Sequence, residues 1–138
     1  MQARSAALKV QGLEKRFGEV AALDGVSLDI VSGELLTILG PSGSGKTTLL
    51  KVVAGFEKAD AGTVRIDGTD ITALPPAKRD IGMVFQNYAL FPHLTVRANV
   101  AFPLEMRNVA RAEIETRVTE ALKLVELSGY DKRLPKQL

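Results

Sequence analysis

The chain has 138 residues, a formal net charge of +2, one histidine and no cysteine. Its length suits a single domain, and its 46% hydrophobic and 25% charged residues are typical of a globular protein rather than a disordered or collagen-like one. The lack of cysteine excludes disulfides and thiolate metal sites, the interleaved charges do not indicate nucleic-acid binding, and no apolar run is long enough to span a bilayer.

The first thirty residues are predicted to form short antiparallel strands. Residues 8–11 and 26–30 alternate between apolar and polar side chains, which is typical of strands with one face in water. Phe17-Gly18-Glu19 is predicted to turn the chain between them.

An α/β segment is predicted next. After a turn at Ser32-Gly33, residues 34–39 are nearly all apolar, which predicts a buried parallel strand. A glycine-rich loop follows, and residues 46–54 are predicted to form a helix that ends at Gly55, a residue suited to a left-handed cap.

Two more strands are expected further along. Residues 63–68 predict a strand that enters a turn, and residues 81–85 are apolar enough for a second buried strand. Leu74-Pro75-Pro76, which lies between these two segments, is expected to break any helix.

From about residue 95 the pattern becomes helical. Apolar residues recur at i, i+4, i+7, i+8 and i+11, which predicts one buried helix face made of Ile114, Val118, Ala121, Leu122 and Val125. A shorter helix is predicted from Thr95 towards Met106, with Pro103 expected to kink or end it.

The segment Gly40–Thr47 matches G-x-x-x-x-G-K-[ST] at every fixed position, between an apolar stretch and a helix. Glycines let main-chain N–H groups approach a polyphosphate, and the helix amino terminus favours an anion. Lys46 is expected to reach the β- and γ-phosphates, and the Thr47 hydroxyl is expected to ligate Mg²⁺. The predicted phosphate-binding residues are Gly40, Ser42, Gly43, Ser44, Gly45, Lys46, Thr47 and Thr48.

The motif alone leaves kinases, GTPases, helicases and transport ATPases open. Four further segments narrow the choice: Leu13–Gly18, Gly62–Gly68, Met83–Val96 and Leu134–Leu138. Together with the phosphate loop, they resemble the nucleotide-binding subunit of ABC transporters, and within that family the importer ATPases for polyamines, sugars, sulfate or iron.

The resemblance implies an α/β fold, with a P-loop NTPase (RecA-like) core, an N-terminal antiparallel β-subdomain, the start of a helical subdomain and an incomplete sheet. It implies a partial nucleotide-binding domain over residues 1–138, with the β-subdomain and core in about 1–94 and the helical subdomain in about 95–138.

The resemblance also assigns roles to single residues. Phe17 would stack on adenine, although a core phenylalanine at a strand end is the alternative. Gln86 would complete the Mg²⁺ shell or hold the attacking water, although a solvated loop glutamine is the alternative. The implied ligands are therefore ATP and Mg²⁺, with Lys46 and Gln86 as the catalytic residues and Thr47 and Gln86 as the metal ligands.

Apolar and aromatic residues follow Gln86, namely Tyr88, Leu90, Phe91, Pro92 and Leu94. In the family this Gln86–Val96 region receives a coupling helix of the transmembrane permease, and packing between core and helices is the other interpretation. The family also implies a second nucleotide-binding subunit in the full-length form and a cytoplasmic location, peripheral on the inner face of the membrane. His93 is isolated in the sequence, so no metal or catalytic role is expected for it.

Several family motifs do not occur in this sequence: the Ser-Gly-Gly-Gln signature, the Walker B strand with its carboxylates, and the switch histidine. Asp67 is the one candidate for a Walker B carboxylate, and a turn is the better interpretation because Gly68 follows it. Hydrolysis needs a metal-binding carboxylate and a general base, so we expect the isolated chain to bind ATP weakly and to hydrolyse little or none. We also expect an exposed apolar sheet edge that is prone to association.

The function expected is that of an ATP-binding subunit, or a fragment of one, of an ABC importer that couples ATP binding and hydrolysis to solute transport. The alternative is a non-catalytic module that docks on a permease without hydrolysing ATP. A small kinase or GTPase is disfavoured, since the sequence has neither an Arg-rich lid nor an Asn-Lys-x-Asp segment. The transported solute is not encoded in any motif found here.

Overall fold

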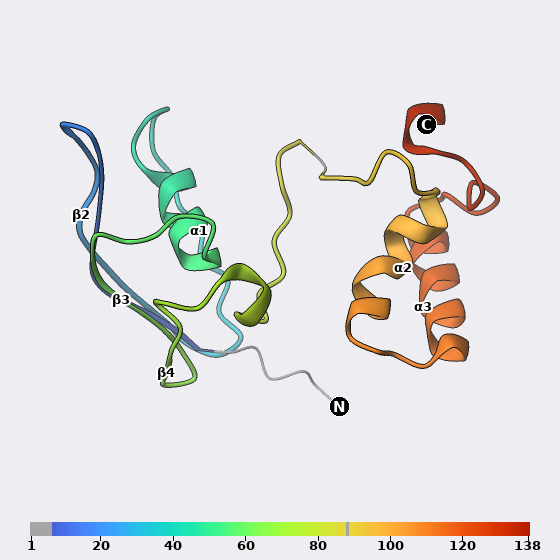
Figure 1. The fold of residues 1–138 in the computed structure, drawn as a ribbon, viewed down its shortest axis with the longest axis horizontal. Helices are drawn as coiled ribbons and strands as arrows, with labels where there is room; N and C mark the ends of the chain where they lie inside the picture. Colours follow the sequence, from blue (N-terminus) through green and yellow to red (C-terminus); the bar gives the residue numbers. More distant parts are fainter. Residues whose placement is uncertain (1–6, 88) are drawn as a thin grey trace. The chain divides into compact units, whose positions relative to one another are not determined.

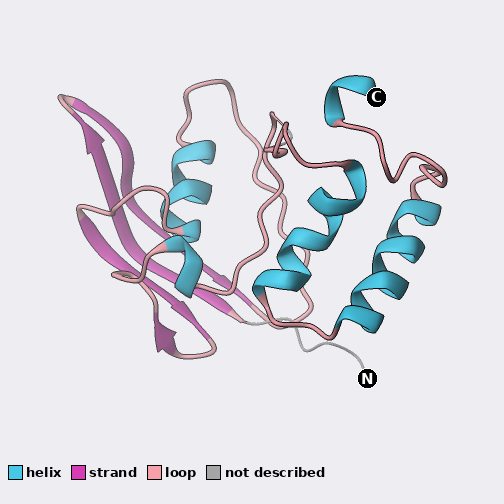
Figure 2. Cartoon of the chain, turned by 45° about the vertical axis from the view of Figure 1, so that its right-hand side comes forward, coloured by secondary structure: helices cyan, strands magenta, loops and turns pink. Residues whose placement is uncertain are grey.

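The computed structural model describes residues 7–87 and 89–138 and divides the chain into two compact units, Met1–Met83 and Val84–Leu138 (Figure 1). In the described residues, the first unit contains a sheet, one α-helix and a short 3₁₀ helix, and the second contains two longer α-helices and a short 3₁₀ helix (Figure 2). Each unit has its own cluster of buried apolar side chains. In the part of the chain that is described, no helix has the length and apolar character that a membrane span requires.

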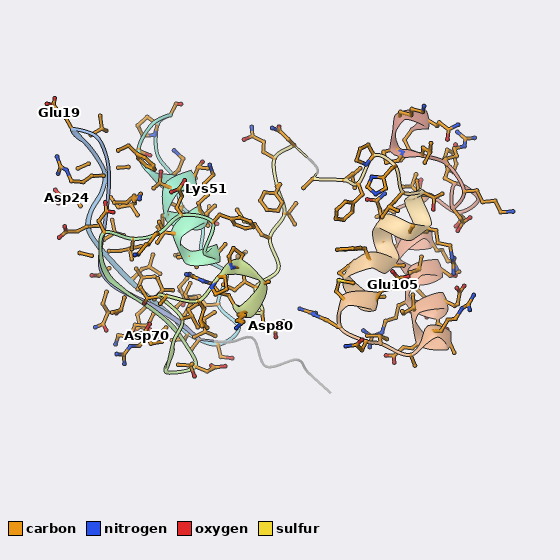
Figure 3. The ribbon with its side chains drawn as sticks, viewed as in Figure 1. Glu19, Asp24, Lys51, Asp70, Asp80 and Glu105 are labelled. Carbon is orange, nitrogen blue, oxygen red and sulfur yellow. The ribbon has the colours of Figure 1, made fainter. Side chains whose placement is uncertain are left out.

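The first unit is built on a four-stranded antiparallel sheet with the order β2-β1-β3-β4. Its strands are β1 (Leu8–Phe17), β2 (Val20–Ile30), β3 (Ala61–Ile66) and β4 (Thr69–Asp70). The β1–β2 hairpin turns at Gly18 and Glu19, and Glu19 lies at its tip (Figure 3). The predicted antiparallel strands, and the turn between them, are therefore confirmed.

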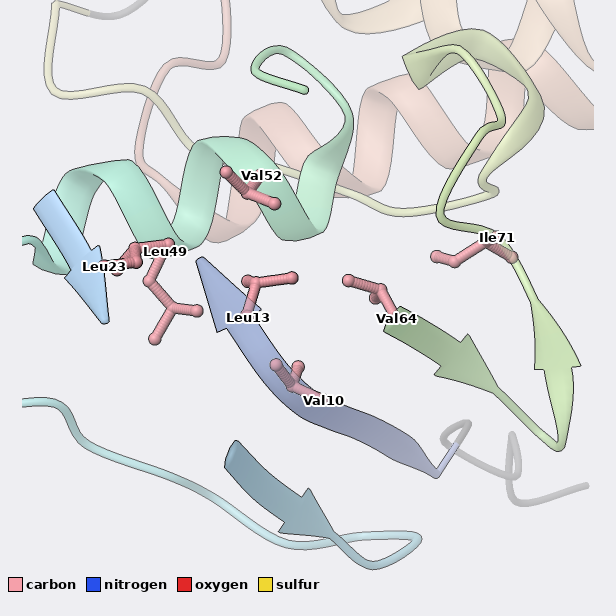
Figure 4. Close-up of a cluster of buried hydrophobic side chains, with 7 residues drawn as sticks. All are labelled: Val10, Leu13, Leu23, Leu49, Val52, Val64 and Ile71. Atoms are coloured by element: carbon pink, nitrogen blue, oxygen red, sulfur yellow. The ribbon is translucent and has the colours of Figure 1, made fainter. Parts of the chain in front are cut away.

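The core of this unit lies between the sheet and α1 (Lys46–Ala54), which has the predicted bounds. Its buried side chains, shown in Figure 4, are Val10, Leu13, Leu23, Leu49, Val52, Val64 and Ile71. Val10 and Leu13 are an odd number of residues apart, yet both are buried. The pairing register shifts between them, and such an irregularity returns the later side chain to the core face.

The β3–β4 connection settles the interpretation of Asp67. Asp67 and Gly68 both have positive φ, 48° and 78°, as a two-residue hairpin turn requires. The Asp67 carboxylate accepts a hydrogen bond from the Ala7 N–H at 3.1 Å. Asp67 is thus a turn residue, as predicted. Beyond β4, Pro76–Lys78 forms the short 3₁₀ helix η1.

Two predicted strands are wrong. Residues 34–39 and 81–85 have no regular secondary structure, and Leu35, Leu39 and Val84 are 91%, 86% and 97% exposed. A strand is held by hydrogen bonds to its neighbours, and no described strand pairs with either segment. Their apolar composition is that of a buried strand, but it does not provide a neighbouring strand with which to pair.

The second unit consists mainly of α2 (Val96–Met106) and α3 (Arg111–Leu124), with the 3₁₀ helix η2 (Pro135–Gln137) near its end. The Thr95 hydroxyl caps α2 by accepting from the Ala98 N–H at 3.2 Å. The buried residues are Val96, Ala101, Ile114, Val118 and Leu122.

Three details of the helical prediction need comment. Ile114, Val118 and Leu122 are buried as expected. Val125 is not: it is 59% exposed, because α3 ends at Leu124 and Val125 caps it. The first helix does not end at Pro103 but continues to Met106, although Pro103 has no N–H to donate and the helix therefore lacks one hydrogen bond there.

Candidate functional site

The predicted phosphate loop forms a narrow backbone arc between residue 40 and α1. Gly45, with φ +86°, approaches β2 so closely that a Cβ there would lie 2.3 Å from the Ala22 carbonyl oxygen. At Gly40 a Cβ would point into the arc, 2.8 Å from the Ser44 Oγ and 3.9 Å from the Lys46 Nζ. A side chain at either position would therefore displace the strand contact or fill the space inside the loop.

The Lys46 ammonium lies within this arc. Its Nζ donates hydrogen bonds to the carbonyl oxygens of Gly40 at 2.9 Å and Pro41 at 2.6 Å, and to the Ser44 Oγ at 3.0 Å. The first regular helical bond, from Leu49 N–H to Gly45 carbonyl at 2.8 Å, leaves the earlier N–H groups of α1 without intrahelical acceptors. A cation and a helix amino terminus thus converge on one point, as an anion site requires.

A cavity of about 150 Å³ adjoins the loop. Its lining residues come from β2 and from the loop with the start of α1: Val20, Ala22, Gly43, Ser44, Gly45, Lys46, Thr47 and Thr48. Val20 and Ala22 were not predicted, because no local motif marks a strand that approaches the loop from more than twenty residues earlier. Ser42 belongs to the same turn but does not line the cavity.

Phe17 lies at the end of β1, directly opposite Val20 in the pairing register. Its side chain is 48% exposed and is not part of the buried core. The Lys15 Nζ lies 5.2 Å from the centre of the Phe17 ring, a cation–π distance. The hairpin therefore presents an exposed aromatic ring beside the strand that lines the cavity.

Acidic residues at the start of β3 hold this end of the hairpin. The Arg16 main-chain N–H donates to the Asp60 carboxylate at 2.7 Å, and the Lys15 Nζ lies 3.6 Å from the same carboxylate. The hydrogen bond from Arg16, followed by the charge of Lys15, holds the pKa of Asp60 below its ordinary value. The ion pair with Asp60 thus holds the Lys15 side chain next to the Phe17 ring.

The described residues contain no group of three His, Cys, Asp or Glu side chains that could hold a metal ion. Thr47, whose side chain is exposed at the cavity, fits a different mode. Mg²⁺ commonly takes one or two protein oxygens and completes its shell with phosphate oxygens and water. A hydroxyl beside a phosphate cradle suits that arrangement.

Gln86 belongs to the second unit, where it is exposed in a turn. Of the apolar residues after it, Tyr88 lies outside the described residues, and Leu90 and Phe91 are 50% and 37% exposed. The Phe91 ring packs against Phe102 with 4.6 Å between ring centres, and it lies edge-to-face with the His93 ring with 6.1 Å between ring centres.

Asn99 fixes the shape of the loop over residues 91–95. Its amide nitrogen donates to the carbonyl oxygens of Phe91, Leu94 and Thr95 at 3.0–3.1 Å. Its Oδ1 accepts from the Phe91 N–H at 2.8 Å. The sequence pattern did not reveal this role, since an asparagine in the first turns of a helix usually reads as a solvated residue. A larger cavity of about 650 Å³ lies along α2 and α3 and contains no predicted site residue.

Comparison with known proteins shows which family the chain belongs to. The family model described as ABC transporter matches residues 23–138. The spermidine/putrescine import ATP-binding protein PotA of Aliivibrio fischeri is 53% identical over 135 residues, which cover 98% of this chain and 36% of PotA. The sulfate/thiosulfate import ATP-binding protein CysA of Nocardia farcinica is 53% identical over 131 residues, 95% of this chain and 40% of CysA.

Two solved structures are also similar. The ATP-binding cassette MJ0796, in a dimeric post-hydrolysis state with ADP and Pi, matches with a TM-score of 0.83 and 35% identity over 95% of this chain and 62% of that chain. The cassette MJ1267 of an ABC transporter matches with a TM-score of 0.79 and 32% identity over 96% and 59%. The α/β fold class is therefore confirmed. The chain spans little more than a third of the length of the curated relatives.

Proposed function

Because the chain belongs to the ABC transporter family, we propose that it is the ATP-binding part of an importer ATPase. The phosphate loop carries the proposal: a glycine-lined arc encloses the Lys46 ammonium and opens on the start of α1. The three oxygens around Lys46 are neutral, so a polyphosphate offers this cation a stronger partner. ATP is the nucleotide that the relatives' names imply.

Each predicted site residue has a place in this proposal. The amides of the loop and of Thr48 bind phosphate oxygens, Lys46 contacts the β- and γ-phosphates, and Phe17 stacks on the adenine. Thr47 holds Mg²⁺, which, when bound, neutralises charge on the β- and γ-phosphate oxygens. Gln86 supplies a further oxygen to the metal or to the attacking water, a role supported by the family resemblance.

We further propose that residues 86–96 meet a transmembrane permease at the inner face of the cell membrane. The exposed Leu90 and Phe91, on a loop held by Asn99, provide the apolar anchors that such an interface needs. The helical subdomain is proposed to begin near residue 95. A second ATP-binding subunit is proposed for the whole protein, since the similar cassette MJ0796 is dimeric. Hydrolysis and transport are likewise proposed for the whole protein.

This stretch of chain does not determine the solute. PotA and CysA are equally identical to it, at 53%, and their names specify a polyamine and a sulfur oxyanion. The shared part is therefore the ATP-binding machinery, and the relatives favour an importer ATPase over a non-catalytic docking module.

Isothermal titration calorimetry of the 138-residue chain with MgATP tests the proposal. Lys46→Ala should weaken MgATP binding about tenfold to a hundredfold, because a hydrogen bond to a charged group is lost. Lys51→Ala removes the same charge from the exposed last turn of the same helix (Figure 3) and should change the affinity less than about twofold. Absence of binding heat in the unmodified chain, or equal losses in both variants, would refute ATP binding at this loop.

A further inference from the structure

Arg79 is the one charged side chain that is buried in the described part of the chain, with 6% exposure. Burial lowers the pKa of its guanidinium below the ordinary value. A buried charge is costly unless hydrogen bonds replace its hydration. No sequence pattern indicates this burial, because Lys78-Arg79-Asp80 is typical of a solvated charged turn.

The guanidinium joins two separate segments through main-chain carbonyl oxygens. Its Nη1 donates to Val52 and Val53, both in the last turn of α1, at 2.8 Å each. On the other side, its Nε donates to Leu74 at 2.7 Å and its Nη2 to Thr72 at 2.8 Å. Arg79 therefore binds two carbonyls at the carboxyl end of α1, of which that of Val52 also accepts from the Gly55 N–H at 3.1 Å, and it ties them to the chain after β4.

That second segment is itself fixed to the sheet. The Val64 N–H in β3 donates to the Thr72 Oγ1 at 2.9 Å, and the Ile71 N–H donates to the Val64 carbonyl at 2.9 Å. The hydrogen-bonded path thus runs from β3 through Thr72 and Arg79 to α1. Gly55, the helix cap, leaves room for it, since a Cβ there would lie 2.5 Å from the Arg79 Nε.

We propose that Arg79 is a positioning residue for the phosphate loop, which it controls from the opposite end of α1. The apolar contacts of Leu49 and Val52 hold the helix against the sheet but do not define its height or rotation, because hydrophobic contact is non-directional. The two directional hydrogen bonds to the Val52 and Val53 carbonyls do define them. The two bonds to Leu74 and Thr72 anchor the guanidinium on its other side. A nine-residue helix is a stiff rod of roughly 13 Å, so its amino end follows its carboxyl end.

The consequence concerns Lys46 and the amides that point into the arc. A shift of about 1 Å at such groups is enough to cost a large part of a binding or catalytic effect. The part of the test that measures nucleotide affinity rests on the proposed ATP-binding function. The shape of the loop can be measured without any nucleotide.

The test uses the 138-residue chain and Arg79→Gln, with Arg79→Lys as the milder variant. In nucleotide-free ¹H–¹⁵N spectra, Arg79→Gln should displace or broaden the amide signals of Gly40, Gly43 and Gly45 while signals of β1 and β3 stay native. By calorimetry, the affinity should fall about tenfold for MgATP, less for MgADP and least for AMP, because the loop acts on the distal phosphates.

The milder Arg79→Lys variant keeps the charge, but a lysine side chain carries its three donors on one nitrogen. It therefore cannot span both segments, and the variant should give an intermediate loss. Lys78→Gln removes a charge from the exposed neighbouring residue and should leave both the loop signals and the affinities unchanged. This control separates the hydrogen-bonded clamp from a general loss of positive charge.

Native loop signals and native affinities in folded Arg79→Gln would overturn the proposal. So would an equal loss for all three nucleotides together with disturbed signals throughout the sheet, which is the pattern of a purely structural residue. If Arg79→Gln does not fold, Arg79→Lys is judged by the same criteria. Absence of MgATP binding in the unmodified chain would refute the proposed function, and the loop signals would still decide on Arg79.

Discussion

The two units of this chain differ in how much of their order depends on pairing between strands that are distant in the sequence. In the first unit β1 pairs with β3, so that Leu8 lies opposite Ile66, and Arg79 reaches back to Val52. In the second unit Asn99 bonds carbonyls only four to eight residues away. Short-range patterns therefore describe the helical unit well, whereas the nucleotide-binding unit depends on pairings that no local window contains.

The largest effect expected from this difference is that the two units unfold at different denaturant concentrations. Leu13 is 0% exposed at the centre of the first core, so Leu13→Ala should destabilise that unit by about 2–5 kcal/mol. Val118 is the matched position in the second core, also 0% exposed, and Val118→Ala should destabilise its own unit by about 2 kcal/mol.

The chain supplies a convenient reporter for this experiment. Of its two tyrosines, Tyr130 belongs to the second unit and Tyr88 lies outside the described residues. Tyrosine fluorescence in urea should therefore move mainly with Val118→Ala, and the β-sheet circular dichroism signal mainly with Leu13→Ala. Equal shifts of both signals in each variant would show that the two units unfold as one.

A smaller and more local effect is expected at Asn99. Asn99→Asp keeps an acceptor for the Phe91 N–H but loses the three bonds donated to carbonyls, and it places a negative charge beside them. The loop over residues 91–95 should open more easily by about 1–3 kcal/mol, measured as faster amide exchange of Phe91 and Leu94. Asn87→Asp introduces the same charge at an exposed turn and should leave this exchange unchanged. Unaltered exchange in Asn99→Asp would refute the proposed role of the amide.

The smallest effect is expected at low pH, and it should fall on the first unit. The hydrogen bond from Arg16 lowers the pKa of Asp60, and hydrogen bonds from Thr72 lower that of Asp70, labelled in Figure 3. A carboxyl whose pKa is lowered in the folded state stabilises the fold at pH values above its ordinary pKa of 3.8. This stabilisation is lost as the pH falls through the pKa of the folded state.

An acid titration of the unmodified chain and of Asp60→Asn checks this prediction. The stability difference between them, followed by the β-sheet circular dichroism signal, should be present at about pH 6 and should shrink below pH 3.8. A difference that grows on acidification would contradict the assigned direction of the pKa shift.

The same contrast explains which features could be predicted from the sequence. The bounds of α1, the Ile114–Val118–Leu122 part of the α3 face and the β1–β2 hairpin follow from local periodicity and from glycine caps, and the structure agrees with them. Residues 34–39 and 81–85 have the composition of buried strands. A strand also needs a second segment with which to form hydrogen bonds, and the composition of one segment does not reveal whether such a partner exists.

The candidate site divides in the same way. The candidate phosphate loop could be predicted because its motif occupies consecutive residues, from Gly40 to Thr47. Val20 and Ala22, which line the cavity, and Arg79, which bonds to the end of α1, were missed because each belongs to a distant part of the chain. Asn99 was missed for a different reason, since its partners are near but its residue type is common on helix surfaces.

The close approach of Gly45 to the Ala22 carbonyl has a consequence for ligand selection. It lets the loop lie against the strand whose first residue, Val20, lies opposite Phe17, so the ring and the arc are close to one another without any ligand. On the proposed roles, a molecule that carries both an aromatic base and a distal phosphate at that spacing gains a chelate advantage, because engaging one end raises the effective concentration of the other. Free polyphosphate and free adenosine lack this chelate advantage. The close approach of Gly45 to β2 would therefore favour ligands of one length.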